Sequence, residues 1–177
     1  FTSSNNNNAL FSTQPAVSTS GTLTFTPAPN AHGSTTITVR ARDNGGTANG
    51  GNNISQPYSF IITVNEVNDV PSFTKGADQT VLEDAGVRGK TGWATNMSAG
   101  PANEATQTWQ FNVTTNNDAL FATLPAVAPN GTLTYTPAAN ANGSATVSVV
   151  MQDNGGITNG GVNTSAAQTF DISITAV

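Results

Sequence analysis

The sequence has no cysteine, a single histidine and few charged residues. Without cysteine it can form no disulfide bond and can use no thiol chemistry. Charged side chains make up 8% of its 177 residues, against roughly 25% in an average globular protein. The net charge of −5 gives no basic patch for nucleic acid, and no apolar run approaches the roughly 18 residues of a membrane-spanning helix. These absences argue against nucleic-acid binding and against membrane insertion.

Ser, Thr, Asn and Gly take the place of the missing charges. Such an uncharged polar surface, with little lysine, suits a secreted or surface-attached protein. The chain starts at Phe1 and shows no signal peptide, so we expect it to be an excerpt of a longer protein.

The sequence repeats itself at a fixed distance. The segment DNGGTANGG at 43–51 returns as DNGGITNGG at 153–161, and residues 1–67 align without a gap with residues 111–177. The offset of 110 residues is too long for a solenoid unit and is the length of a whole β-sandwich domain. We therefore expect a complete module at 68–177. Residues 1–67 would be the C-terminal part of a preceding module whose first strands are missing.

Within the module, apolar and polar residues alternate with a period of two. Leu133 and Tyr135, for example, share one face of a strand while threonines occupy the other face. Gly, Pro and Asn clusters separate such runs, and no stretch keeps a helical period. The pattern predicts an all-β fold of tandem antiparallel β-sandwich modules, of Greek-key type with about seven strands each, the first module being incomplete. The predicted strands of the complete module lie near residues 72–82, 91–98, 106–115, 119–127, 131–136, 144–152 and 167–176.

No catalytic group can be assembled from these residues. The only histidine, His32, has Asn142 as its counterpart in the second copy of the repeat, so we expect it to be a turn residue. Glu83 and Asp84 are adjacent and would diverge in a strand, so they form no pair of facing carboxylates for glycoside hydrolysis. We expect that the chain is not an enzyme.

Aromatic residues bear on the question of carbohydrate binding. Trp109 and Tyr135 share the parity of aliphatic core residues, so we expect both in the core. Tyr58 stands where the second copy has Gln168, and we expect it to be exposed. One exposed aromatic side chain does not form a sugar-binding platform.

An aspartate opens each Gly/Asn loop. Asp43 and Asp153 stand at the end of a strand, and the Asn-Gly and Gly-Gly pairs that follow allow a tight reversal of the chain. In a seven-stranded sandwich this loop lies at the same pole as the N-terminus, so Asp153 should lie beside the linker that enters its module. Two roles fit these aspartates: each caps its own turn, or each holds a cation at a junction.

Three segments resemble a known family. VNEVNDVPSF at 64–73 is similar to the linker of cadherin repeats, and TVLEDAGVRGKTGWATNMSAG at 80–100 is similar to their first two strands. LTYTPAANANGSATVSV at 133–149 resembles the bacterial cadherin-like and Ig-like tandem repeats of large surface or secreted proteins. The resemblance implies a cadherin-like sandwich at the bacterial cell surface.

Cadherin modules bind calcium at their junctions, and the resemblance implies which residues would do so here. Ca²⁺ takes about six to eight oxygen ligands from carboxylates, amides and carbonyls. The candidates at the junction of the two modules are Glu66, Asn68, Asp69, Glu104 and Asp153. The candidates at the outer junctions are Asp43 and Glu83.

The family pattern is kept only in part. Val70 stands where the linker has its last Asn, Glu66 where it has its first Asp, and the carboxylate pair before the strand near 144–152 is absent. The remaining ligands are too few for the family's cluster of three ions, which leaves one Ca²⁺ at the junction as the expectation. The alternative is that Asn68 and Asp69 hydrogen-bond the turn before the next proline, with no metal.

The sequence therefore predicts a non-catalytic, extracellular structural repeat of a bacterial surface protein, acting as a spacer, stalk or filament segment. Its partners would be neighbouring repeats of the same chain. Sheet edges left open in the incomplete module could also pair with other copies of the chain. The alternative is an adhesion module that binds carbohydrate or protein.

Overall fold

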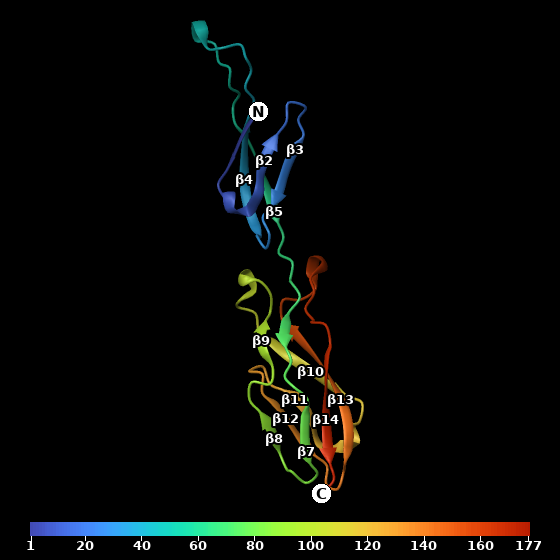
Figure 1. The fold of residues 1–177 in the computed structure, drawn as a ribbon. Helices are drawn as coiled ribbons and strands as arrows, with labels where there is room; N and C mark the ends of the chain where they lie inside the picture. Colours follow the sequence, from blue (N-terminus) through green and yellow to red (C-terminus); the bar gives the residue numbers. More distant parts are fainter. The chain divides into compact units, whose positions relative to one another are not determined.

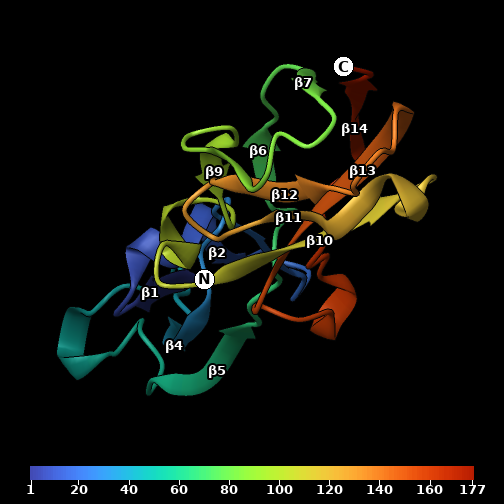
Figure 2. The same cartoon turned by 90° about the horizontal axis from the view of Figure 1, so that it is seen from below.

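The computed structural model describes residues 1–177, with 49% of them in strands and 8% in helix (Figures 1 and 2). The chain divides into two compact units, Phe1–Val67 (unit 1) and Asn68–Val177 (unit 2). No helix is long and apolar enough to cross a membrane. The helical segments are short 3-10 turns: η1 Asn8–Leu10, η2 Ala48–Gly50, η3 Ala102–Glu104, η4 Asp118–Leu120 and η5 Thr158–Gly160.

Unit 2 is a β-sandwich. One sheet has the strand order β10-β13-β14-β7 and the other has the order β11-β12-β8, while β6 and β9 form a separate pair. Neighbouring strands are antiparallel except β7 and β14, which are parallel, with Gln79 beside Ile172. The strands are β6 Ser72–Thr74, β7 Gln79–Leu82, β8 Arg88–Lys90, β9 Thr95–Ser98, β10 Trp109–Thr115, β11 Phe121–Val127, β12 Leu133–Pro137, β13 Gly143–Asp153 and β14 Gln168–Thr175.

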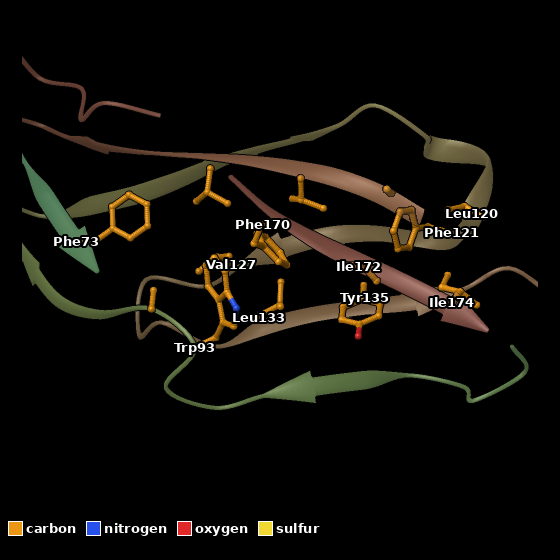
Figure 3. Close-up of a cluster of buried hydrophobic side chains, with 14 of the residues drawn as sticks. Phe73, Trp93, Leu120, Phe121, Val127, Leu133, Tyr135, Phe170, Ile172 and Ile174 are labelled. Atoms are coloured by element: carbon orange, nitrogen blue, oxygen red, sulfur yellow. The ribbon is translucent and has the colours of Figure 1, made fainter. Parts of the chain in front are cut away.

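The core of unit 2 contains side chains from both sheets, which point toward one another in Figure 3. Along β13, alternate residues from Ala145 to Met151 are at most 1% exposed, as the period of two requires. Trp93, from the connection between β8 and β9, packs on Phe170 of β14 with ring centroids 4.4 Å apart. The segment that carries β6 to β9 therefore contributes to the core as well as to the sheet edges.

Unit 1 has the same register as the second half of unit 2 but fewer strands. Ile37 lies opposite Phe60 in unit 1, as Val147 lies opposite Phe170 in unit 2. Its sheets have the orders β1-β4-β5 and β2-β3. The strands are β1 Thr2–Asn5, β2 Phe11–Val17, β3 Leu23–Pro27, β4 Gly33–Arg40 and β5 Tyr58–Val64. The buried hydrophobic cluster is Leu10, Phe11, Ile37 and Ile62.

The predicted all-β sandwich is confirmed, but two predicted strands are wrong in detail. The strand expected at 72–82 is interrupted between β6 and β7, and the strand expected at 91–98 is replaced by β8 and β9. The residues at both interruptions lie next to the buried Trp93. A Cβ on Gly76 would lie 2.5 Å from Cδ1 of the indole ring, and Gly92 has a φ of +65°, so the chain bends where the ring is inserted.

The predicted positions of the aromatic side chains are confirmed. Tyr135 is 2% exposed, and Trp109 packs against the core cluster while remaining partly buried. Its indole Nε1 donates a hydrogen bond to the Pro129 carbonyl at 3.1 Å. Tyr58 is 76% exposed. The single parallel pair, β7 with β14, departs from the purely antiparallel arrangement that was predicted.

Candidate functional site

Asn68, the first residue of unit 2, is buried in a set of hydrogen bonds within that unit. Its side-chain Nδ2 donates to Asp153 Oδ1 at 3.0 Å and to the Val162 carbonyl at 2.9 Å. Its Oδ1 accepts from Gln107 Nε2 at 2.8 Å. The backbone joins in as well, because Val162 N donates to the Asn68 carbonyl at 3.0 Å. One amide side chain therefore connects the start of the unit to two of its loops.

Asp153 ends β13 and lies at the entry of the Gly/Asn loop. It is 5% exposed, and its Oδ1 also accepts from Gly155 N at 2.9 Å, which closes the turn. Gly155 is required by close packing, since a Cβ there would lie 1.7 Å from Asn68 Oδ1. The loop therefore leaves room for the Asn68 side chain. The prediction that Asp153 lies beside the linker is confirmed.

Glu104, in η3, holds the next residue of the linker. It is 1% exposed, and its Oε1 accepts a hydrogen bond from Asp69 N at 2.9 Å. A Cβ on Gly100 would lie 1.8 Å from Glu104 Oε2, so this glycine is needed where the carboxylate packs against the chain. Two loops therefore hydrogen-bond the first two residues of unit 2. The loop after β13 binds Asn68, and the loop between β9 and β10 binds Asp69.

Three buried oxygen atoms in these loops have no hydrogen-bond partner: Glu104 Oε2, Gln107 Oε1 and Asp153 Oδ2. A buried acceptor without a partner is costly, and more so when it belongs to a carboxylate. All three atoms are oxygens, the ligand type that calcium prefers. No group of three or more His, Cys, Asp and Glu side chains could hold a metal ion, so a cation here would also need amide or backbone oxygens.

The equivalent loop of unit 1 is more exposed. Asp43 Oδ1 accepts from Gly45 N at 2.8 Å, which is the same turn contact as in unit 2. The Asp43 side chain is exposed, however, and a Cβ on Gly45 would meet only Asp43 itself. The turn-capping role of the aspartate is therefore common to both copies, while a hydrogen bond from an asparagine side chain to the aspartate is present in unit 2.

Two of the remaining predicted ligands have partners within their own units. Glu66 belongs to unit 1, where its Oε1 is 3.6 Å from His32 Nε2. Glu83 follows β7, and its carboxylate accepts from Val177 N at 3.1 Å and from Asn142 Nδ2 at 3.5 Å. Of the five predicted ligands in unit 2, the structure brings together Asn68, Asp69, Glu104 and Asp153.

Gln107 is part of this site but was not predicted from the sequence. It orients the Asn68 amide and contributes one of the unpaired oxygens. Its position precedes the repeated region 111–177, so it has no counterpart in unit 1. The internal repeat therefore could not single it out, and the amide is one of many in an Asn-rich sequence.

Comparison with known proteins gives a fold but no family. No family model and no curated protein matches the chain. The crystal structure of human Protocadherin-24 EC1-2 is similar, with a TM-score of 0.53 and 16% identity over 98% of this chain and 81% of that chain. S-layer protein SbsC domains 4 and 5 match at a TM-score of 0.34 and 12% identity, over 99% of this chain and 76% of that chain. The first similarity shows a cadherin-like β-sandwich fold.

Proposed function

We propose that the chain is a non-catalytic structural segment of an extracellular bacterial surface protein, with its β-sandwich units serving as spacers or stalk elements. The observation that carries this proposal is the double anchoring of Asn68 and Asp69 in the loops of unit 2. The anchoring fixes the direction in which the chain enters the unit, which a spacer needs. It uses buried carboxylates for structural hydrogen bonds with the entering chain.

Calcium is the second part of the proposal, and the residues present fit it. Glu104 and Asp153 each contribute a buried carboxylate oxygen that has no hydrogen-bond partner. Gln107 contributes a buried amide oxygen that also has none. These residues, with the backbone around Asn68 and Asp69, would hold the ion. Calcium would supply positive charge to two buried carboxylates and would tie the loop before β10 to the loop after β13. Unit 2 would then be stiffened where the chain enters.

The test is thermal unfolding of the chain in calcium and in excess chelator, followed by tryptophan fluorescence. Trp93 and Trp109 are the only tryptophans, so the signal reports unit 2 alone. For a Kd of about 10⁻⁴ M, as in extracellular modules, about 10 mM Ca²⁺ is roughly 100 times the Kd. Binding would then add about 2.7 kcal/mol and raise the Tm of unit 2 by roughly 10 °C.

Two variants locate the ion and one serves as a control. Glu104→Gln and Asp153→Asn should abolish the calcium-dependent rise in Tm, because each removes a carboxylate from the site. Asp118→Asn makes the same change of charge at an exposed position of unit 2 and should keep the rise. Equal Tm values in calcium and chelator would sink the calcium proposal. The spacer proposal would then rest on the protein hydrogen bonds alone, and Asn68→Ala should speed hydrogen exchange at the amide of Val162.

A further inference from the structure

A hollow opens between the two sheets of unit 2, on the side where β7 is the last strand of one sheet and β8 is the last strand of the other. Its volume is about 410 Å³, and its lining comes from β7, β8, the two residues before β7 and Tyr135 of β12. That volume is within the range of sites that hold small organic ligands. The hollow lies inside unit 2 and shares no residue with the site around Asn68.

Two of the chain's five basic side chains line this hollow. Arg88 lies opposite Tyr135, and Lys90 lies opposite Leu133, in the pairing of β8 with β12. Directly opposite side chains share a face of the sheet, and Leu133 and Tyr135 face the core. Both cations therefore lie on the inward face of the sheet, at its open rim. Neither forms an ion pair or a side-chain hydrogen bond, so their charge is free to meet a ligand.

The Tyr135 hydroxyl is a third donor in the hollow. The residue is 2% exposed, and its hydroxyl has no hydrogen-bond partner. In Figure 3 its oxygen points away from Phe121, the ring on which Tyr135 packs. Burial raises the pKa of Tyr135 above 10.0, with Arg88 close enough to oppose part of the rise, so the hydroxyl keeps its proton at neutral pH. A ligand oxygen would supply the acceptor that this buried donor lacks.

The hollow also offers two acceptors. Gln79 Nε2 donates to the carbonyls of Ala77 and Asp78, at 2.8 Å and 3.0 Å, which leaves Gln79 Oε1 for an incoming donor. Asp78 Oδ1 accepts from Asp171 N at 3.0 Å, and its Oδ2 has no partner. A simple anion would be repelled by Asp78, whereas a ligand with both an acidic group and hydroxyl groups matches the whole lining. An acidic peptide fits less well, because Val81 is the only large apolar side chain that lines the hollow.

From this set of donors and acceptors we infer that unit 2 binds an acidic sugar, a unit of a carboxylate-bearing polysaccharide, in the hollow between β7 and β8. Arg88 would hold the carboxylate through two parallel N–H groups, and Lys90 would supply a second positive charge. Tyr135 would donate to a sugar oxygen, while sugar hydroxyls would donate to Gln79 and Asp78. Arg88 and Lys90 are about 6.6 Å apart along the strand, and two cations in a row favour a chain of acidic sugars over a single anion.

This inference goes beyond the proposed spacer role and depends neither on that role nor on calcium. Inward-pointing charges on an edge strand also discourage pairing with other chains. That role uses the charges of Arg88 and Lys90 but needs neither the unpaired Tyr135 hydroxyl nor the two acceptors. The experiment therefore has to separate binding of a sugar from protection of an edge.

The experiment follows the amide chemical shifts of the ¹⁵N-labelled 177-residue chain during titration with tetragalacturonate, a chain of four carboxylated sugars. The buffer has low ionic strength and no calcium, because the carboxylates of the probe bind calcium themselves. Saturable shifts should be confined to β7, β8 and the part of β12 around Tyr135. Galactotetraose, the neutral sugar of the same length, should give no shifts. Tetraglutamate has the carboxylates without the hydroxyls and should bind at least about fivefold more weakly.

Three variants of the chain test the named contacts. Arg88→Gln and Lys90→Gln should each weaken binding of tetragalacturonate at least about tenfold, because each removes a charge-assisted hydrogen bond. Both residues are exposed, so the fold should be kept. Tyr135→Phe retains the core ring and should weaken binding about fivefold. As the control, Arg42→Gln makes the same change of charge at an exposed position of unit 1 and should leave the Kd within about twofold.

Three results would overturn the inference. The first is the absence of saturable shifts with tetragalacturonate. The second is a loss of affinity in the Arg88→Gln and Lys90→Gln chains no larger than that in the Arg42→Gln chain; self-association of the first two in sedimentation would then assign the charges to edge protection. The third is equal affinity for tetraglutamate, which would mean that the hollow responds to charge and not to a sugar.

Discussion

Units 1 and 2 share sequence and strand register but differ in how many hydrophobic side chains they bury. The hydrophobic cluster of unit 1 contains four buried residues, whereas that of unit 2 contains fifteen. Ile37 in unit 1 and Val147 in unit 2 are both fully buried. Further along the central strand, however, Val39 is only partly buried, whereas its counterpart Val149 is fully buried. Unit 2 also has β7, β8 and Trp93, which unit 1 lacks. The comparison therefore separates the burial that strand alternation provides in both units from the additional burial that residues 68–110 provide in unit 2.

The largest expected effect concerns matched leucines. Leu133→Ala should destabilise unit 2 by roughly 4 kcal/mol, because Leu133 is fully buried and its removal leaves a cavity. Leu23→Ala should cost unit 1 about 1 kcal/mol or less, since this side chain is 37% exposed. Denaturant unfolding by tryptophan fluorescence measures unit 2, and hydrogen exchange of peptides from 1–67 measures unit 1. Similar losses at both positions would mean that Leu23 is covered in solution.

Matched glycines give the next largest effect. Gly131→Ala should cost unit 2 about 3 kcal/mol, because the new Cβ would meet the Ala94 carbonyl and a φ of +82° disfavours alanine. Gly21→Ala has a φ of +84° but meets no neighbour, so only the backbone term of roughly 1–2 kcal/mol applies. The same two measurements apply. Equal costs would show that backbone strain, and not the contact with residues 79–94, distinguishes these glycines.

The two loop aspartates should differ by a smaller amount. In calcium-free buffer, Asp153→Ala should cost unit 2 about 2 kcal/mol, because it leaves Asn68 Nδ2 without one acceptor in a buried place. Asp43→Ala loses only an exposed turn contact and should cost unit 1 about 0.5 kcal/mol. Urea unfolding of unit 2 and hydrogen exchange at Gly45 check these values. A loss of 2 kcal/mol at both sites would assign the whole effect to turn capping.

The smallest effect concerns pH. Burial raises the pKa of Tyr135 above its ordinary value of 10.0, and the nearby Arg88 partly opposes this. The folded state therefore keeps a proton that the unfolded state loses, so the stability of unit 2 should fall as the pH rises above 10. Tyr135→Phe should reduce this fall, whereas Tyr58→Phe, at an exposed position, should leave it unchanged. Urea midpoints of unit 2 between pH 9 and pH 11 provide the measurement.

The strands with clear alternation were predictable from the sequence, and the short ones were not. β13 carries an apolar residue at every second position from Ala145 to Met151, and β14 does so from Phe170 to Ile174, so their faces follow from the pattern alone. β8 has the sequence RGK and is exposed throughout, so no periodicity marks it. Its place is set by pairing with β12 and by Trp93, which lies beside Phe170 across the core. Contacts between distant residues of this kind leave no local signal.

The site was predictable to a similar extent. The end of a strand and the start of the module meet at one pole of a sandwich, so the contact of Asp153 with Asn68 followed from topology. The cadherin resemblance drew attention to Asp69 in the linker and to Glu104 after the second predicted strand, and these two residues form the second anchor. The unpaired state of Glu104 Oε2 and the part played by Gln107 depend on how the loops pack. Sequence spacing does not contain that information.

The parallel pairing of β7 with β14 has a mechanical consequence. A force that pulls the two ends of unit 2 apart draws these strands in opposite directions along their length. The contacts from Gln79 beside Ile172 to Leu82 beside Thr175 then carry the load together, in shear, and must break nearly at once. The hydrogen bond from Glu83 N to the Thr175 carbonyl, at 2.8 Å, extends this set. Resistance of unit 2 to stretching is therefore concentrated in one short pair of strands.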